Sequence, residues 1–122
     1  MKYVFIFVIC TSPLLAFASI QTDACSEMEN IRKKLNIISS NIANLSTTRT
    51  PDGGPYSRKE FVCSEKKCEV KEYYKIVTKY KPDHPDADEN GYVSYPDIDI
   101  KQEMESMIQA TRDYEVAANT CK

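Results

Sequence analysis

Two stretches with helical periodicity, one at each end of the sequence, limit the possible folds more than any other feature. In both, apolar residues recur at steps of three and four, which is typical of a narrow stripe along an α-helix that needs a partner. The stripes consist of Met28, Ile31, Leu35, Ile38, Ile42 and Leu45, and of Ile100, Met104, Met107, Thr111, Tyr114, Ala118 and Cys121. We therefore expect an α+β fold in which an antiparallel, coiled-coil-like pair of terminal helices, residues 24–45 and 100–121, holds a β-rich middle at residues 46–99.

The amino-terminal segment 1–18 has the pattern of a secretory signal peptide. Lys2 precedes an apolar run, and Ala16-Phe17-Ala18 has the small residues of a cleavage site. The run is short and contains Pro13, whereas a permanent membrane anchor needs about 20 apolar residues. We expect cleavage after Ala18, which leaves a single domain at residues 19–122 with no stable membrane span.

The charge balance and the polar motifs argue against nucleic-acid binding and catalysis. Without Lys2, the 16 basic residues of the sequence become 15, against 18 acidic residues, so the mature chain has no basic excess to attract nucleic acid. His84, the single histidine, lies between two prolines, and no recognisable base stands beside a serine or cysteine. Glu103 and Glu105, together with Lys101, are interpreted as an exposed charged face of the second helix. We expect no catalytic residues and no cofactor.

Cleavage of the leader would leave four cysteines, Cys25, Cys63, Cys68 and Cys121. An even number in an exported chain predicts two disulfides, for which three pairings exist. If the terminal helices are antiparallel, Cys25 lies beside Cys121, and Cys63 and Cys68 flank a short polar connection that suits a bridged β-hairpin. We expect these two pairs. Zinc is the alternative, which one near pair with two isolated cysteines does not favour.

The middle of the chain divides into short strands and breaker-rich loops. Residues 46–55 contain two prolines and a glycine pair, which cannot continue a helix. Residues 56–63 and 68–72 are predicted to form a hairpin, residues 74–80 a further strand, and residues 91–95 a last short strand, because β-branched and aromatic side chains are frequent in them.

One acidic segment has the spacing of a calcium loop. Asp86, Asp88, Asn90 and Asp97 occupy ligand positions of such a loop, although Asp97 stands where a bidentate glutamate is usual. Prolines on both sides of the segment exclude the flanking helices that a calcium loop requires. We therefore assign no metal site and keep calcium binding as a weak alternative.

Two blocks of the sequence resemble the bacterial flagellar basal-body rod proteins, and specifically the FlgC family of the proximal rod. The blocks are Asn36–Asn44 with Thr47–Tyr56, and His84–Val93 with Pro96–Asp99, Glu103-Met104 and Met107-Ile108 through Tyr114-Glu115. Residues that carry the resemblance, and that we take as candidate assembly residues, are Asn36, Ser40, Asn41, Ile42, Asn44, Thr48, Arg49, Pro51, Gly53, Gly54, Pro55, Gly91, Tyr92, Val93, Tyr114 and Glu115.

The resemblance implies a non-enzymatic, periplasmic subunit of the flagellar rod that contributes to motility. In such proteins the terminal helices form an antiparallel coiled coil and stack with other rod proteins, or with further copies, into a helical wall. Asn41 and Asn44 fit either the end of the first helix or a subunit contact. The leader and the paired cysteines also fit an alternative, a secreted disulfide-stapled derivative that acts as a periplasmic or extracellular interaction module.

Overall fold

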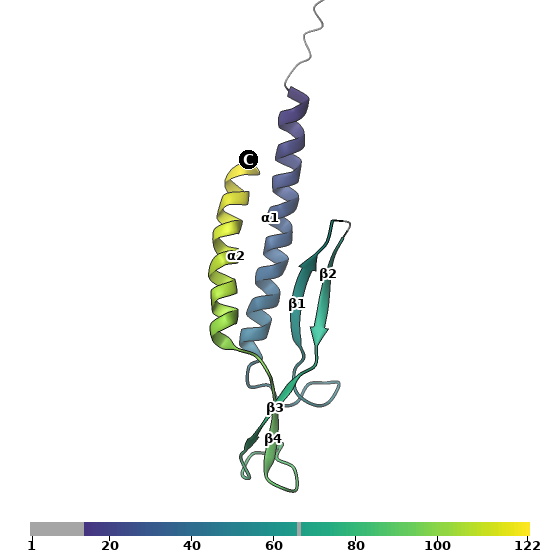
Figure 1. Cartoon of the computed structure of the whole chain (residues 1–122), viewed down its shortest axis with the longest axis vertical. Coiled ribbons are helices and arrows are strands. Elements are labelled where there is room, and N and C mark those ends of the chain that lie inside the picture. The colour runs from purple at the N-terminus through teal and green to yellow at the C-terminus, as the bar shows by residue number, and fades with distance from the viewer. Residues whose placement is uncertain (1–13, 66) are drawn as a thin grey trace, which may run out of the picture.

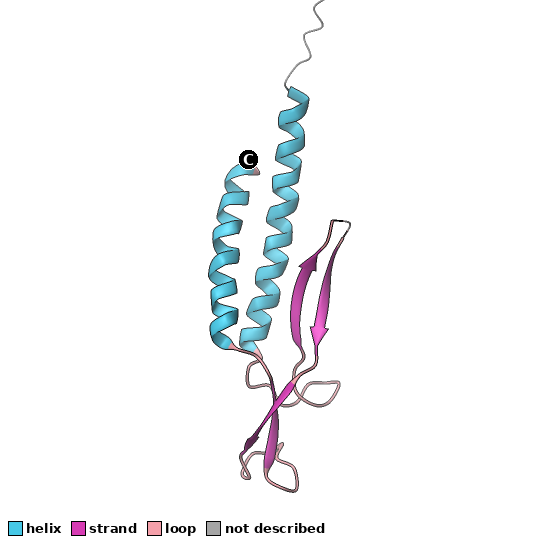
Figure 2. Ribbon diagram, viewed as in Figure 1, coloured by secondary structure: helices cyan, strands magenta, loops and turns pink. Residues whose placement is uncertain are grey.

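A computed structural model of the chain describes residues 14–65 and 67–122. The elements in chain order are α1 (Leu14–Ala43), β1 (Arg58–Cys63), β2 (Cys68–Tyr73), β3 (Ile76–Tyr80), β4 (Tyr92–Pro96) and α2 (Ile100–Thr120). Figure 1 shows α1 and α2 side by side in opposite directions, with the β1–β2 hairpin along α1 and the β3–β4 hairpin beyond one end of the helix pair. The fold is thus the predicted α+β arrangement, with two antiparallel hairpins between two terminal helices (Figure 2).

Helix α1 begins earlier than the sequence pattern predicts. It starts at Leu14 rather than Ala24 and therefore includes residues 14–18 of the predicted leader, while the rest of that leader lies outside the described residues. No glycine or proline interrupts the chain after Pro13 until Pro51, so nothing in the backbone ends a helix before Ala24. In the part of the chain that the structure describes, neither helix is long and apolar enough to cross a membrane.

The two helices pack through a seam that matches the prediction for α1 but is rotated for α2. The core consists of Ile31, Ile38, Ala110 and Ala117, with Met28, Leu35, Ile42, Met107 and Tyr114 packed against it. Met104 is 52% exposed and Ile100 48% exposed, and Thr111 is also exposed, so the prediction that these residues face α1 is wrong. The small alanines at this seam allow the helix backbones to approach closely, while Ile100 and Met104 lie on the exposed side of α2.

A disulfide joins the two helices at one end of their seam, and a capping residue begins α2 at the other end. At one end the Cα atoms of Cys25 and Cys121 lie 4.7 Å apart in a disulfide. At the other end Asp99 caps α2, because its carboxylate accepts a hydrogen bond from Lys101 N at 2.9 Å. Antiparallel packing explains the disulfide, because it brings Cys25 of α1 beside the end of α2, whereas the Asp99 cap is a local feature of α2 itself.

In each hairpin one strand packs against other parts of the molecule and the other strand is exposed. In the first, β1 contacts α1 while β2 is exposed along its whole length, and a disulfide joins Cys63 to its cross-strand partner Cys68. In the second, β3 is exposed throughout, whereas Val93 and Tyr95 of β4 are buried. The predicted strand at residues 74–80 is shorter than expected and begins at Ile76. Each hairpin therefore presents one strand to solvent.

Candidate assembly site

The side chain of Asn41 joins three elements at the lower end of the helix pair. Its Nδ2 donates to Lys59 O at 2.7 Å, and its Oδ1 accepts from Lys59 N at 3.0 Å. This amide thus pairs with the backbone of β1 as a neighbouring strand would. It also accepts from the Tyr56 hydroxyl at 3.0 Å and donates to Glu103 Oε2 at 3.2 Å. The full hydrogen-bonding capacity of the amide is used, which explains why it tolerates burial at 1% exposure.

Glu103 is the second buried polar residue of this junction. It is 2% exposed, so the interpretation of Glu103 as part of an exposed charged face is wrong. Its Oε1 accepts from Arg58 Nε at 2.6 Å, which compensates for the burial of a carboxylate. Burial by itself would lower the pKa of Arg58, but the hydrogen bonds and charges of Glu103 and Glu60 together outweigh it and raise that pKa above its ordinary value. Together Asn41, Lys59, Arg58 and Glu103 form what we call the polar junction.

The chain leaves α1 through a short hydrogen-bonded turn. Asn44 Nδ2 donates to Ser40 O at 2.8 Å, and Thr47 Oγ1 donates to Asn44 Oδ1 at 3.0 Å. The Ser40 hydroxyl lies 3.1 Å from the Tyr56 hydroxyl, which connects this turn to the polar junction. Asn44 therefore satisfies backbone and side-chain groups where the helix ends, one of the two roles that the sequence left open.

Two family blocks that are distant in sequence meet at Asp86. Thr48 Oγ1 donates to Asp86 Oδ2 at 2.6 Å, and Arg49 forms an ion pair with the same carboxylate. The hydrogen bond from Thr48, and the charge and hydrogen bond of Arg49, lower the pKa of Asp86 from its ordinary value despite an opposing effect of desolvation. The loop after α1 and the loop before β4 are thus tied together.

Glycines allow the close turns within both blocks. Gly53 and Gly54 have positive φ angles of 87° and 73°, and Thr50 N donates to Gly54 O at 2.8 Å. Pro51 is exposed and Pro55 is buried at the two ends of this turn. Gly91 has a φ of 86°, and a Cβ atom there would lie 2.8 Å from the Tyr80 ring. The turn before β4 therefore requires glycine for its backbone angle and for its space.

The calcium-loop candidates are engaged with protein groups. The Asp88 carboxylate accepts from Asn90 N and Tyr92 N, both at 2.9 Å, and Asp97 lies 3.1 Å from Lys75 Nζ. Asp86 is held by the contacts described above. Within residues 14–65 and 67–122, no three histidine, cysteine or carboxylate side chains come close enough together to hold a metal ion.

Several of the candidate assembly residues lie away from the junction. Asn36 is exposed on α1, Ile42 packs against the helical core, and Tyr114 packs on the seam while Glu115 is exposed on α2. Val93 is fully buried in β4, where Tyr92 contacts Tyr80 edge to face with ring centroids 5.4 Å apart. The structure thus gathers the first block and Asp86 at one end of the helix pair, and leaves the rest distributed.

Sequence reasoning missed Arg58 and Glu103 as parts of the site. The available signal was the spacing of Glu103, Ala110 and Ala117 at steps of seven, which places the glutamate on the same helical stripe as two small residues. A charged residue on such a stripe indicates a buried pair. The apolar residues Ile100 and Met104 favoured a different stripe, and for that reason Glu103 was not predicted to be buried.

Comparison with known proteins identifies relatives of this chain. Residues 26–49 match the family model described as flagella basal body rod protein. The chain is 34% identical over 113 residues to the flagellar basal-body rod protein FlgC of Borreliella burgdorferi, covering 69% of this chain and 74% of the relative. It is 32% identical over 115 residues to the FlgC protein of Salmonella typhimurium, covering 83% of this chain and 84% of the relative.

A third relative extends the comparison to another bacterial group. The FlgC protein of Agrobacterium fabrum is 35% identical over 116 residues, covering 84% of this chain and 81% of the relative. These similarities cover between 69% and 84% of the chain rather than a single motif. The chain therefore belongs to the FlgC family of flagellar basal-body rod proteins, whose members are structural, non-enzymatic components of the rod in the periplasmic space.

Proposed function

We propose that this chain is a subunit that packs against other rod proteins, and against copies of itself, in the helical wall of the rod. The observation that carries the proposal is the polar junction, in which Asn41 and Glu103 bind α1, α2 and β1 to one another. A rod subunit under load must resist rotation of its β region about its helices. A buried, fully hydrogen-bonded junction provides that resistance because each group would lose its partner if the elements turned.

We further propose that the chain enters the periplasm through the general secretory pathway and loses residues 1–18 there. The Ala16-Phe17-Ala18 pattern and the pairing of all four remaining cysteines support this route, because disulfides form in the oxidising periplasm. Amino-terminal sequencing of the periplasmic protein should begin at Ser19. A chain that begins at Met1 would contradict secretory processing and leave the rod assignment intact.

The rod role is tested by deletion and by fractionation. A strain that lacks the gene should lose swimming in soft agar, and a plasmid copy should restore it. The wild-type protein should copurify with detergent-extracted basal bodies.

The second candidate, a secreted interaction module, is favoured by the two disulfides, which give the folded chain stability of its own. It predicts the opposite outcome: a motile deletion strain, and protein in the soluble periplasm or the medium. That result would overturn the rod proposal.

A further inference from the structure

Two surfaces within the described residues 23–65 and 67–122 are exposed to solvent, and their apolar and charged groups complement each other. We propose that a groove between α2 and the β1–β2 hairpin of one copy receives the outer face of α2 from a second copy, so that copies join head to tail. The inference rests on the proposed assembly of this chain into the rod, and it specifies which surfaces meet.

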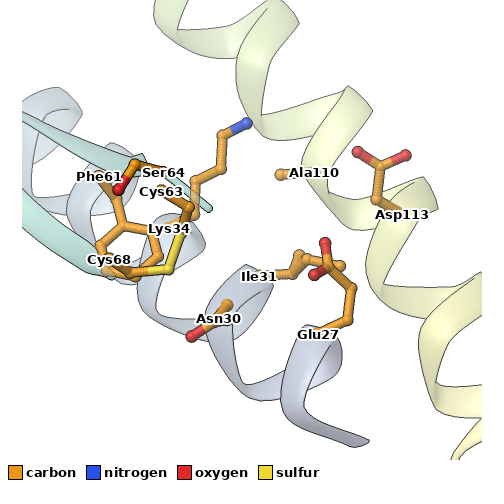
Figure 3. Close-up of a pocket in the computed structure, with 10 residues that line it drawn as sticks. All are labelled: Glu27, Asn30, Ile31, Lys34, Phe61, Cys63, Ser64, Cys68, Ala110 and Asp113. Carbon is orange, nitrogen blue, oxygen red and sulfur yellow. A yellow bond between two sulfur atoms is a disulfide. The ribbon is translucent and has the colours of Figure 1, made fainter. Parts of the chain in front are cut away.

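The groove has an apolar floor and a charged rim. A hollow of about 350 Å³ lies between the helix pair and the hairpin, and its floor contains Ile31, Phe61 and Ala110. Glu27, Lys34 and Asp113 stand at its rim. Figure 3 shows α2 with Ala110 and Asp113 on one side and the hairpin with Phe61 and the Cys63–Cys68 disulfide on the other. We call these six rim and floor residues the hairpin groove.

The groove continues along the helix pair rather than ending as a closed cavity. A second hollow of about 150 Å³ shares Lys34 and Phe61 with the first and extends to Arg58 and Glu103 at the polar junction. It arises because β1 packs on α1, while α2 packs on a different side of α1. An elongated groove with apolar residues along its base fits a helix better than a compact ligand.

The outer face of α2 offers a matching surface. Met104 and Ile108 are 52% and 54% exposed, and Glu105 and Arg112 are exposed beside them. We define these four residues as the outer face. Ile108 offers the largest apolar gain on burial at this face, because an exposed isoleucine side chain would be removed from water. It lies between Glu105 and Arg112 in the sequence, and a hollow of 350 Å³ has room for it.

The charges of the two surfaces match in sign and in spacing. On α1, Lys34 and Glu27 are seven residues apart, and on α2 Glu105 and Arg112 are also seven residues apart. Because α1 and α2 are antiparallel, an α2 helix that enters the groove parallel to the resident α2 would set Glu105 against Lys34. It would at the same time set Arg112 against Glu27. Ile108 would then lie over Ile31, between the two ion pairs.

The positions of the surfaces on α2 decide what kind of assembly results. Glu103, Ala110 and Asp113 lie on the groove side of α2, whereas the outer face points away from α1 and from the groove. A copy docked through its outer face therefore still presents its own groove to the next copy. Such a heterologous contact continues as an open chain instead of closing into a symmetric dimer.

The test uses two variants that each remove one surface. Ile108→Glu disables the outer face and leaves the groove, and Lys34→Glu disables the groove and leaves the outer face. Analytical ultracentrifugation of the oxidised mature protein should show concentration-dependent association of the wild type. For each variant alone, the dissociation constant of self-association should be at least about tenfold higher than that of the wild type. Ile76→Glu on exposed β3 and Lys33→Glu on α1 are the matched controls and should behave as the wild type.

Mixing the two variants separates this docking mode from the others. Head-to-tail docking predicts that the mixture forms a one-to-one dimer that does not grow, since each partner supplies the surface that the other lacks. The double variant Lys34→Glu with Glu105→Lys should regain part of the lost association. A monomeric wild type, a mixture that does not pair, or association only with a different rod protein would overturn the inference. Protein that is monomeric yet copurifies with basal bodies would overturn the docking mode alone and leave the rod function standing.

Discussion

The side chain of Asn41 pairs with the backbone of β1 in the way that the backbone of a neighbouring strand would. Its amide binds the N–H and the carbonyl of Lys59 and uses its remaining capacity on Tyr56 and Glu103. Buried amides are costly when unpaired and stabilising when fully paired. The junction therefore depends on a residue whose size and two-sided chemistry no apolar substitute can reproduce.

Replacement of Asn41 by alanine should lower the free energy of unfolding by about 2–4 kcal/mol, because the backbone of Lys59 and the carboxylate of Glu103 lose a partner. Urea denaturation of the oxidised protein measures the effect. Asn36→Ala, an exposed asparagine on the same helix, is the control and should change stability by about 0.5 kcal/mol or less. Equal effects of the two substitutions would argue against the junction.

Gly53 and Gly91 have similar positive φ angles, but only Gly91 is crowded by neighbouring atoms. Alanine substitutions at the two positions therefore distinguish the destabilisation caused by the backbone angle from that caused by a steric clash. Gly91→Ala should destabilise the chain by about 2–3 kcal/mol, since a Cβ meets the Tyr80 ring and Pro82 in addition to the unfavourable angle. Gly53→Ala should cost only about 1 kcal/mol, because a Cβ there meets nothing within 4 Å. Thermal denaturation of both variants tests the order, and a larger effect at Gly53 would contradict it.

At the scale of the elements, the two disulfides restrict different lengths of the unfolded chain. Cys25–Cys121 has a sequence separation of 96 and joins α1 to the carboxyl end of α2, whereas Cys63–Cys68 has a separation of 5 and joins two neighbouring strands. The entropy that a disulfide removes from the unfolded chain grows with loop length. The first bond therefore restricts the whole domain, and the second restricts only the hairpin.

Replacement of both cysteines of a pair by serine should reveal this difference. In the chain-entropy account, loss of Cys25–Cys121 lowers the free energy of unfolding by about 4–5 kcal/mol, and loss of Cys63–Cys68 by about 2 kcal/mol. Guanidinium denaturation of the two double variants provides the comparison. Mass spectrometry of the wild type should recover both pairings, and a larger loss from the hairpin pair would refute the ranking.

At the scale of the whole molecule, contacts between distant loops set the position of the β3–β4 hairpin. The loop after α1 reaches the loop before β4 through Thr48, Arg49 and Asp86. These residues belong to the two blocks that carry the family resemblance. Their contact connects the loop after α1 to the β3–β4 hairpin, which lies beyond the end of the helix pair that is opposite to the C-terminus (Figure 1).

This contact should make stability dependent on pH. The pKa of Asp86 is lower in the folded chain than its ordinary value, so its contribution is fully present above the ordinary carboxyl range. It is lost as the pH falls through the lowered pKa. Asp86→Asn should therefore narrow the difference in stability between neutral and strongly acidic pH. Asp83→Asn, at an exposed position of the same loop, serves as the control, and an equal narrowing in both variants would exclude Asp86 as the cause.

The sequence by itself determined the elements and the family. Helical periodicity at both ends, proline and glycine in the connections, and two cysteines that flank a short polar connection are local signals. They led to the antiparallel helix pair and to the hairpin predicted at residues 56–63 and 68–72, while the FlgC resemblance came from two blocks of the sequence. The helices and the hairpin follow from spacing along the chain, which requires no knowledge of what lies across a contact, whereas the family follows from the resemblance of the two sequence blocks.

Only the tertiary structure decided which face of α2 meets α1. The pattern favoured the large apolar residues Ile100 and Met104, but the seam is built on Ala110 and Ala117, with Glu103 buried beside Asn41. A prediction from local periodicity depends on the hydrophobicity of each residue. Burial in the packed structure depends also on how closely two backbones can approach and on whether each buried polar group finds a partner. Those two quantities belong to pairs of elements, and for that reason the buried glutamate and the exposed outer face of α2 became visible only in the folded molecule.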